Sequence, residues 1–573
     1  MNKIFISALD GATWTLLQPW IDQGALPNLA KLQREGVSGL LRSTLPVITS
    51  AAWSAFSTGK DPSNTGIYDF FSWQNKSYLV RTVTRLQVKG VSLWKQLSRH
   101  GKKSIIINVP MTYPAEEDPN ILMIAGIPAP HVDSQGFTHP PDLFERFHLD
   151  RHQYQIGVRL PKYEGRHADL VADLKKMVRE RLRAAEVLIK ERWDFFMVHF
   201  YATDVIQHAL WKFVDPSHPQ YDPDSAAKYG NGLLEVFSEV DQAIGRLLNQ
   251  VDLDLTTILI MSDHGFGPNR YTLHINRWLQ EIGMLRLHPP LTRLGWDISR
   301  ILLSKLGLTS DGMTSQVMKR LSFILGCLLP LTLQNGMLQV PRRLLSRFAV
   351  WSNLLNRRGY RPMLEGMDWG RTQAYSVGTT GLIRINLRGR EPQGSVSPGQ
   401  EYEKIRETIA KELLALTDAH GQKLLDRVFR KEEIYHGSSL DEAPDLIPLS
   451  ETVGCYFYPF LDREGIITEA ERFRSGNHRR DGILMAKGSP IRQQAHLETI
   501  NITDLAPTIL YALGIPLPRD MDGSVAREMF QFRFLAEHPV QQSEVSESAV
   551  PDQTVLPNDE SQMAKKLEDL GYL

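Results

Sequence analysis

Five short apolar runs, each closed by polar or acidic side chains, constrain the fold of this chain more than any other feature. The runs are KIFISALD at 3–10, KSIIINVP at 103–110, FFMVHFYATD at 195–204, TTILIMSDHG at 256–265 and GILMAKG at 482–488. Continuous apolarity is typical of strands covered on both faces in a parallel sheet. Amphipathic stretches with helical spacing lie between them, the clearest at 168–192, 226–250 and 401–416. This alternation predicts an α/β fold, with a doubly wound, mostly parallel sheet flanked by helices.

One basic segment interrupts this pattern. Residues 288–361 carry 11 Lys and Arg against two Asp, and they include stretches with helical apolar patterning. We interpret residues 288–368 as a helical basic cap, inserted between a first core part at 1–287 and a second core part at 369–536. Residues 537–573 are mostly polar and acidic, so we expect a C-terminal tail that closes in a short helix-like stretch.

Composition and charge exclude several classes of protein. The 573 residues include 65 basic and 65 acidic ones, so we expect no binding of a nucleic acid polymer. Two distant cysteines exclude a disulfide framework and a thiolate zinc module. The N-terminus lacks a signal-peptide core and the longest apolar run, 321–333, is too short to span a bilayer, so we expect a cytoplasmic protein. The segment 288–361 leaves three interpretations open: a lid that recruits an anionic substrate, a membrane-surface contact or, favoured over both, a helical cap with a charged outer face.

Carboxylate and imidazole side chains gather at the ends of the predicted strands. In open α/β sheets, ligands bind at the carboxyl ends of the strands. Three carboxylates and three imidazoles, without a thiolate, form the ligand set of a catalytic Zn²⁺ or Mn²⁺ site. Each motif alone fits a cap or a turn, but their joint occurrence at strand ends favours metal binding. The candidate ligands are Asp10, Asp204, His208, Asp263, His264 and His478.

A hydroxyl group completes this set. The stretch TLPVITSAAWSAFSTG at 44–59 changes at Thr49 from a loop into a run of small residues that predicts a helix. Thr49 therefore lies near a helix N-terminus, where free backbone amides and the helix dipole favour an anion. A threonine hydroxyl is a weak nucleophile unless its pKa is lowered, and a bound divalent ion does this.

The motifs ALDG, TSAAW followed by STG, TDxxxH, SDHG and a late GNH resemble the alkaline phosphatase superfamily, in particular its type I phosphodiesterase and nucleotide pyrophosphatase branch. The chain is most similar to bacterial proteins of that superfamily described as predicted phosphohydrolases or phosphomutases. The resemblance covers residues 4 to about 525 apart from the basic insertion.

This resemblance implies a phosphoric ester hydrolase with two divalent ions, Zn²⁺ as the first choice and Mn²⁺ as the second. Asp204, His208 and His478 would hold one ion. Thr49 would attack phosphorus, and water activated by that first ion would cleave the phosphothreonine intermediate. The second ion would be held by Asp10, Asp263, His264 and Thr49.

The sequence departs from the family at one position. The asparagine that holds a phosphoryl oxygen in the nucleotide pyrophosphatase branch is here Ala52, followed by Trp53. We take Trp53 and Arg479 as candidate substrate contacts and Ser50 as the alternative nucleophile. Diesters are favoured over monoesters as substrates. A phosphomutase or phosphotransferase is the enzymatic alternative, and a non-catalytic scaffold that binds an anionic membrane or a partner is the alternative of another class.

Overall fold

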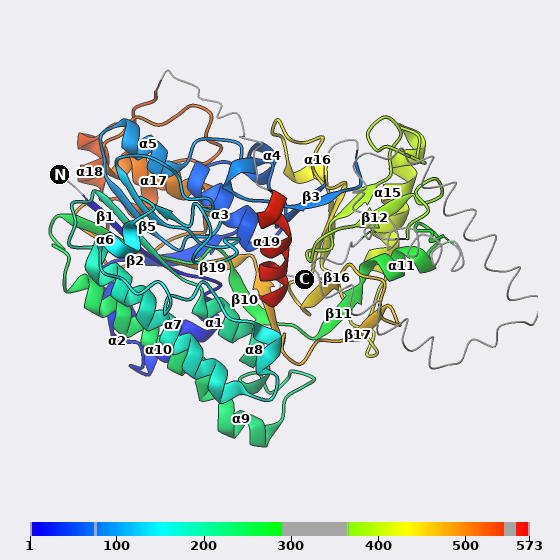
Figure 1. Ribbon diagram of the computed structural model, residues 1–573, viewed down its shortest axis with the longest axis horizontal. Coiled ribbons are helices and arrows are strands. Elements are labelled where there is room, and N and C mark those ends of the chain that lie inside the picture. The colour runs from blue at the N-terminus through cyan, green and yellow to red at the C-terminus, as the bar shows by residue number, and fades with distance from the viewer. Residues whose placement is uncertain (1–2, 74–76, 289–363, 365, 544–556, 571–573) are drawn as a thin grey trace, which may run out of the picture.

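The computed structural model describes residues 3–73, 77–288, 364, 366–543 and 557–570, and a ten-stranded sheet forms its centre (Figure 1). The strand order is β20-β2-β19-β9-β1-β8-β5-β6-β7, with β21 beside β2. The pairs that join β1, β5, β6, β8 and β9 are parallel, whereas β19 runs antiparallel to its two neighbours. The predicted doubly wound, mostly parallel α/β sheet is therefore confirmed. The strands are β1 Lys3–Leu9, β2 Val37–Arg42, β5 Ser104–Ile107, β6 Ile121–Ile124, β7 Thr138–His139, β8 Phe195–Phe200, β9 Thr256–Met261, β19 Asp481–Lys487, β20 Ala495–His496 and β21 Ile500–Asn501.

Each of the five apolar runs contributes a strand to this sheet. Every residue of β8 and of β9 is buried, as is every residue of β1 except the first. Burial on both faces explains why these strands lack the polar alternation of a sheet with one solvated face.

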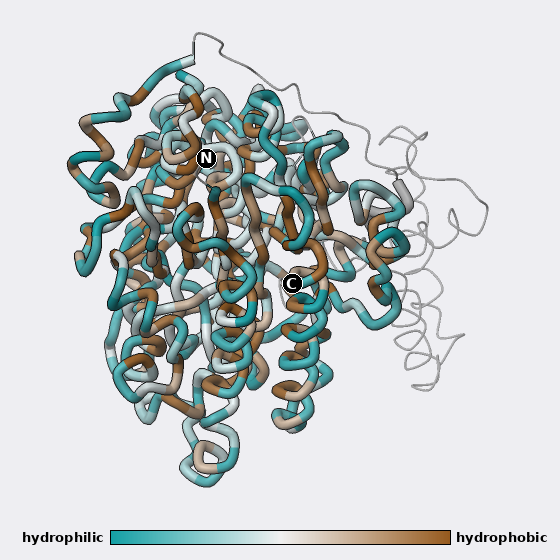
Figure 2. Tube along the Cα trace, turned by 90° about the vertical axis from the view of Figure 1, so that its left-hand side faces the viewer, coloured by the Kyte–Doolittle hydropathy of each residue, from teal (hydrophilic) through white to brown (hydrophobic). Residues whose placement is uncertain are grey.

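Helices cover the sheet in two groups. The helices α2, α7, α8 and α10 pack together, and α3, α5 and α17 form a second group on the other side (Figure 1). Hydrophobic and hydrophilic stretches alternate along the outer helices in Figure 2, as amphipathic helices require. The helices of this core are α1 Trp14–Asp22, α2 Pro27–Glu35, α3 Thr49–Thr58, α4 Pro62–Thr65, α5 Leu93–Arg99, α6 Leu143–Arg146, α7 His167–Leu188, α8 Ala202–Leu210, α9 Pro223–Tyr229, α10 Asn231–Leu248, α17 Leu505–Ala512 and α18 Phe532–Glu537.

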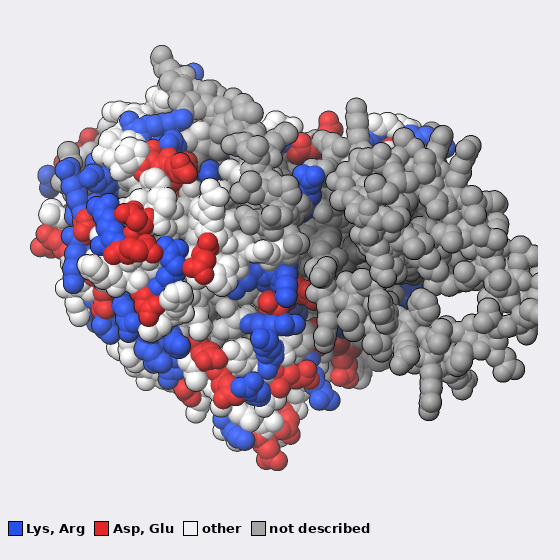
Figure 3. Space-filling model, in the orientation of Figure 1, with Lys and Arg blue, Asp and Glu red and all other residues white. Residues whose placement is uncertain are grey.

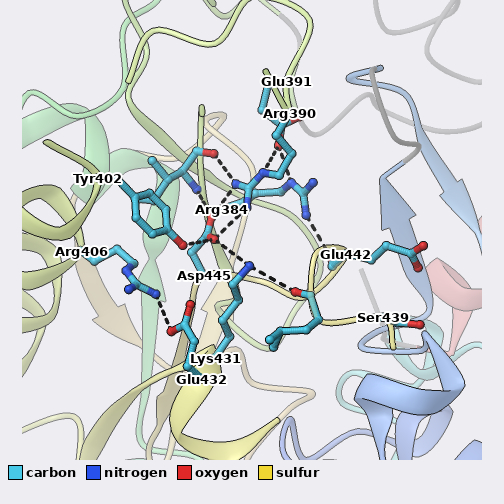
Figure 4. A network of polar contacts seen from close by, with 12 residues as sticks. Arg384, Arg390, Glu391, Tyr402, Arg406, Lys431, Glu432, Ser439, Glu442 and Asp445 are labelled. Atoms are coloured by element: carbon cyan, nitrogen blue, oxygen red, sulfur yellow. Dashed lines mark hydrogen bonds and ion pairs between the residues drawn. The ribbon is translucent and has the colours of Figure 1, made fainter. Parts of the chain in front are cut away.

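A second, smaller region of short strands lies beside the large sheet (Figure 1). Its four-stranded antiparallel sheet has the order β12-β13-β15-β14, and a three-stranded sheet has the order β16-β11-β17. A buried polar network centred on Asp445 holds β13 and β15 together (Figure 4). The strands are β11 Tyr271–His274, β12 Ala374–Ser376, β13 Ile383–Ile385, β14 Arg427–Arg430, β15 Leu446–Leu449, β16 Cys455–Tyr458 and β17 Ile467–Glu469, and the helices are α11 Ile275–Glu281, α15 Gln400–Leu414 and α16 Lys431–Ile434.

Two short antiparallel strand pairs form separate two-stranded sheets. β10 (Gly265–Pro268) pairs with β18 (Gly476–Arg479), and β3 (Phe71–Trp73) pairs with β4 (Val80–Thr82), both antiparallel. The first pair lies directly after the strand end that carries SDHG, so it places a late segment of the chain beside an early one.

The structure describes little of the predicted basic cap but part of the predicted C-terminal tail. Residues 289–363, most of the predicted cap and nearly all of the segment proposed for membrane contact, lie outside the described residues. Within the predicted tail, the helix α19 (Pro557–Asp569) buries Met563 and Leu567, and Asp569 pairs with Arg159 at 2.9 Å. In the face that Figure 3 shows, basic and acidic side chains of the described residues intermingle. No helix in the described part of the chain has the length and apolarity that a membrane crossing requires.

Candidate metal centre

The carboxyl ends of three adjacent strands bring the first ligands together. Asp10 follows β1 directly, Asp263 lies two residues beyond β9, and Asp204 lies in the first turn of α8, just after β8. β1 pairs with β8 on one side and with β9 on the other, so all three strands end at one edge. The three aspartates are fully buried there.

His208 and His478 complete a first cluster with Asp204. His208 lies one helical turn after Asp204, with its Nε2 atom 3.5 Å from Oδ1 of that carboxylate. His478 comes from β18, opposite Phe266 of β10, and its Nε2 lies 3.2 Å from Asp204 Oδ1. The Nε2 atoms of the two histidines are 3.1 Å apart. Ligand atoms of all three residues therefore lie close enough together to hold one ion.

A second cluster surrounds His264. Its Nε2 atom lies 3.5 Å from Asp10 Oδ1, 3.3 Å from Asp263 Oδ2 and 3.3 Å from Thr49 Oγ1. Ligand atoms of Asp10, Asp204 and His264 also lie within 4.8 Å of one another, so Asp204 belongs to both clusters. Thr49 is the first residue of α3, where the first N–H groups have no acceptor within the helix.

The tautomers of the three histidines favour metal binding through Nε2. Each Nδ1 faces a backbone carbonyl oxygen, at 2.7 Å for His208, 3.0 Å for His264 and 3.4 Å for His478. A carbonyl oxygen only accepts, so Nδ1 carries the proton and Nε2 of the neutral ring keeps its lone pair. Contacts of this kind orient metal-bound histidines. The carbonyl groups belong to Gly476, Gly265 and Val47.

The carboxylates have no directly paired Lys or Arg among the described residues. Within the same part of the chain, oxygen atoms of each of the three aspartates accept no hydrogen bond. Burial raises the pKa of Asp10, Asp204 and Asp263, with mutual repulsion adding to the shift for Asp10. Burial also lowers the pKa of His478 to about 3, so the ring is neutral. Orphaned carboxylate oxygens beside neutral imidazoles fit hard or borderline divalent cations.

His199 forms a hydrogen bond with one of the candidate ligands and was not predicted from the sequence. Its Nε2–H donates to Asp10 Oδ2 at 2.7 Å, and the residue is 1% exposed. Gly11 N–H donates to Asp263 Oδ1 at 3.2 Å, and Gln207 holds the carbonyl oxygen of Gly11. His199 stands as a lone polar residue inside the apolar run FFMVHF, which is a signal that the sequence did contain.

The remaining sequence candidates lie at different places. Trp53 is fully buried, with its ring edge-on to that of His199 at 5.1 Å. The guanidinium of Arg479 donates to backbone carbonyl oxygens, including that of His478 at 2.9 Å, so these donors hold the β10–β18 pair. Ser50 is buried one residue after Thr49, and its hydroxyl has no hydrogen-bond partner in the described chain.

Comparisons with known proteins identify a family and a shared fold. Residues 4–321 match the family described as type I phosphodiesterase / nucleotide pyrophosphatase. No curated protein matches the chain. The structure of phosphonoacetate hydrolase from Sinorhizobium meliloti 1021 with phosphonoacetate is similar, with a TM-score of 0.51, 12% identity and coverage of 89% of this chain and 95% of that one. The structure of human ectonucleotide pyrophosphatase / phosphodiesterase 5 has a TM-score of 0.47 and 12% identity to this chain. That match covers 94% of this chain and 99% of the human one. The first of these likenesses shows a shared fold.

Proposed function

Because the chain belongs to the type I phosphodiesterase / nucleotide pyrophosphatase family, and so to the metal-dependent phosphoester hydrolases, we propose that it cleaves phosphodiesters with Thr49 as nucleophile beside two divalent ions. Asp204, His208 and His478 would hold one ion. The other would be held by Asp10, Asp263, His264 and Thr49, with Zn²⁺ the first candidate and Mn²⁺ the second. A scaffold without catalysis is not expected from a member of this family.

The observation that carries the proposal is the convergence of ligand atoms on one threonine. Thr49 Oγ1 lies 3.3 Å from His264 Nε2, and that nitrogen lies within 3.5 Å of carboxylate oxygens from two different strand ends. A role in helix capping or in turns would not explain why carboxylates without an ion-pair partner converge around a buried hydroxyl group. The placement of Thr49 at the start of α3 adds the positive end of the helix dipole where a phosphoryl group would lie.

The reaction follows as an in-line displacement at phosphorus. Bound ions of this kind lower the pKa of a hydroxyl group and offset the charge on the attacking and leaving oxygens. Thr49 Oγ forms a bond to phosphorus while the bond to the leaving oxygen breaks, and the alcohol leaves with a proton. Water then attacks the phosphothreonine, which frees Thr49 and releases a phosphate monoester. His199 keeps Asp10 oriented throughout by its donated hydrogen bond.

Hydrolysis of bis-p-nitrophenyl phosphate in Zn²⁺ or Mn²⁺ tests this assignment. We expect Thr49→Ala and Asp263→Ala to lower kcat by roughly 10³-fold or more, as loss of a nucleophile or of its activating group does. Thr58→Ala is the matched control, because Thr58 ends the same helix. Normal turnover by Thr49→Ala would reject the nucleophile. Recovery of a labelled phosphoryl group on an added alcohol, in place of hydrolysis products, would indicate a transferase.

A further inference from the structure

A pocket of about 60 Å³ lies beside the candidate metal centre, between the loop before α3 and the smaller region. By volume it has room for roughly four to six water molecules, and so for a small polar group. Its lining includes Ile48, Thr379, Tyr456, Arg474 and His478. Of the six Asp and His candidates, His478 alone borders it within the described chain. With the transferred phosphoryl group at the metal centre, this pocket would receive another part of the substrate.

Arg474 is the unusual member of this lining. It is only 4% exposed, and its guanidinium lies over the ring of Tyr456 at 4.3 Å. Its side chain makes no hydrogen bond or ion pair within the described residues, although its charge partly offsets the rise that burial causes in the pKa of the Asp204 carboxyl. An arginine buried to this degree is ordinarily paired, because an uncompensated buried charge is costly.

Other buried arginines in the same region show the contrast. Arg384 pairs with Glu391 at 2.6 Å, and Arg406 pairs with Glu432 at 2.7 Å. Glu451 also lines the pocket, and its Oε1 accepts the backbone N–H of Arg480 at 2.7 Å. Burial, and after it the charge of Arg474, lowers the pKa of both His208 and His478, so the cation lies close to the metal centre.

We propose that Arg474 forms an anion subsite that selects phosphodiesters carrying a second negative charge on the ester substituent. The oxyanion of that substituent, a carboxylate or a phosphate, would accept a forked pair of hydrogen bonds from the planar guanidinium. Asn477 and Thr380 line the same pocket, and they already donate to the Cys455 carbonyl oxygen at 3.4 Å and to Asp69 Oδ2 at 3.0 Å. This subsite rests on the proposed phosphodiesterase function, because it presumes the transferred phosphoryl group beside Thr49. It also provides a substrate contact in a chain that has Ala52 near its nucleophile.

A pair of nearly isosteric substrates tests the subsite. The probes are p-nitrophenyl 3-carboxypropyl phosphate and its 3-carbamoylpropyl counterpart, which differ in charge and little in shape. With the metal-loaded protein, we expect kcat/KM to be about 10- to 100-fold higher for the acid, the range that one charge-assisted forked contact provides. A third probe with a terminal phosphate shows which oxyanion is preferred.

Variants then locate the preference. In Arg474→Gln the ratio should fall to about one while the carbamoyl substrate is still cleaved, and Arg474→Lys should keep part of the preference. Arg472→Gln is the matched control, because it makes the same change at an exposed arginine two residues away. Equal loss on both substrates, in a variant with unchanged metal content and thermal unfolding, would place Arg474 at the transferred phosphoryl group and overturn the proposal. So would a wild-type protein that cleaves both substrates equally.

Binding separates failure of the subsite from failure of the proposed function. Calorimetry measures the binding of 4-phosphonobutanoate and of its amide to the wild-type protein. It depends neither on catalytic turnover nor on the folding of a variant. If wild-type protein hydrolyses neither diester, the proposed function is wrong, yet tighter binding of the acid than of the amide would still support the anion subsite. Equal binding of the two phosphonates would refute it.

Discussion

Replacement of Asp445 by Asn tests the physical account of the smaller region, whose strand β15 supplies a wall of the pocket. Asp445 is fully buried and accepts two bonds from Arg390, at 2.8 and 2.6 Å, one from Tyr402 at 2.6 Å and one from the Ile385 N–H at 2.7 Å (Figure 4). Lys431 Nζ lies 3.6 Å away. Asn keeps the shape of this group but removes the charge that neutralises the half-buried Arg390 and the buried Lys431.

The expected cost follows from what remains in Asp445→Asn. Removal of one partner from a buried ion pair costs about 3–5 kcal/mol, because the other charge is left uncompensated. Glu391 still lies 3.1 Å from Arg390, so the lower end of this range applies. We therefore expect the free energy of unfolding to fall by about 3 kcal/mol at pH 7.

Urea unfolding of both proteins as a function of pH measures this loss. Burial alone would raise the pKa of Asp445, but the hydrogen bonds and charge of Arg390, with Lys431 and Arg384, hold it well below its usual range. A carboxylate whose pKa is lowered by folding stabilises the protein above its unfolded pKa, about 3.9, and loses this contribution as the pH falls through the folded value. The difference in the free energy of unfolding between wild type and Asp445→Asn should thus be largest at pH 7 and decrease only below about pH 4.

The control is Glu537→Gln, which breaks the exposed pair between Arg533 and Glu537 at 2.8 Å. That change should cost less than about 0.5 kcal/mol. A loss below about 1 kcal/mol in Asp445→Asn, or a difference that does not decrease in acid, would refute the reasoning.

Three further predictions concern the core around the centre. His199→Ala should weaken divalent-ion binding about 10- to 100-fold, because Asp10 loses its orienting donor, and chelator competition that shows wild-type affinity would contradict this. Gly11→Ala should lower the free energy of unfolding by about 1–3 kcal/mol, because φ of Gly11 is +66° and the added Cβ would lie 2.7 Å from the Phe266 ring. An unchanged urea midpoint would show that the substitution introduces no strain. Burial raises the pKa of Asp69 to about 7, so folding favours its protonated form and stability falls as the pH rises from about 4 to 7. Asp69→Asn should therefore gain stability relative to wild type between pH 5 and pH 8, and a constant difference would contradict the assignment.

The convergence of the strand-end aspartates could be predicted because it depends on local pattern and on one general rule. Asp10, Asp204 and Asp263 follow continuous apolar runs, and parallel strands present their carboxyl ends at one edge. The spacing of Asp204 and His208 places both on one helical face. None of these inferences required knowledge of the strand order.

His478 is among the ligands predicted from the sequence, but local pattern supplies neither its place in the fold nor the burial of Arg474. His478 reaches the centre through the antiparallel pair β10–β18, which joins segments about two hundred residues apart in a register set by tertiary packing. The short strands of the smaller region, such as β12 and β13 with three residues each, give too little periodicity to be recognised. Arg474 stands in a sequence rich in arginine, and only the fold shows that it is buried without a partner while Arg472 is exposed.

Anomalous diffraction from crystals grown with Zn²⁺ or Mn²⁺ tests the central claim most directly. Two anomalous peaks are expected, one within bonding distance of Asp204 and the Nε2 atoms of His208 and His478, and one beside Asp10, Asp263, His264 and Thr49 Oγ1. A single ion elsewhere on the chain, or a His478 side chain turned away from Asp204 in the presence of metal, would contradict it.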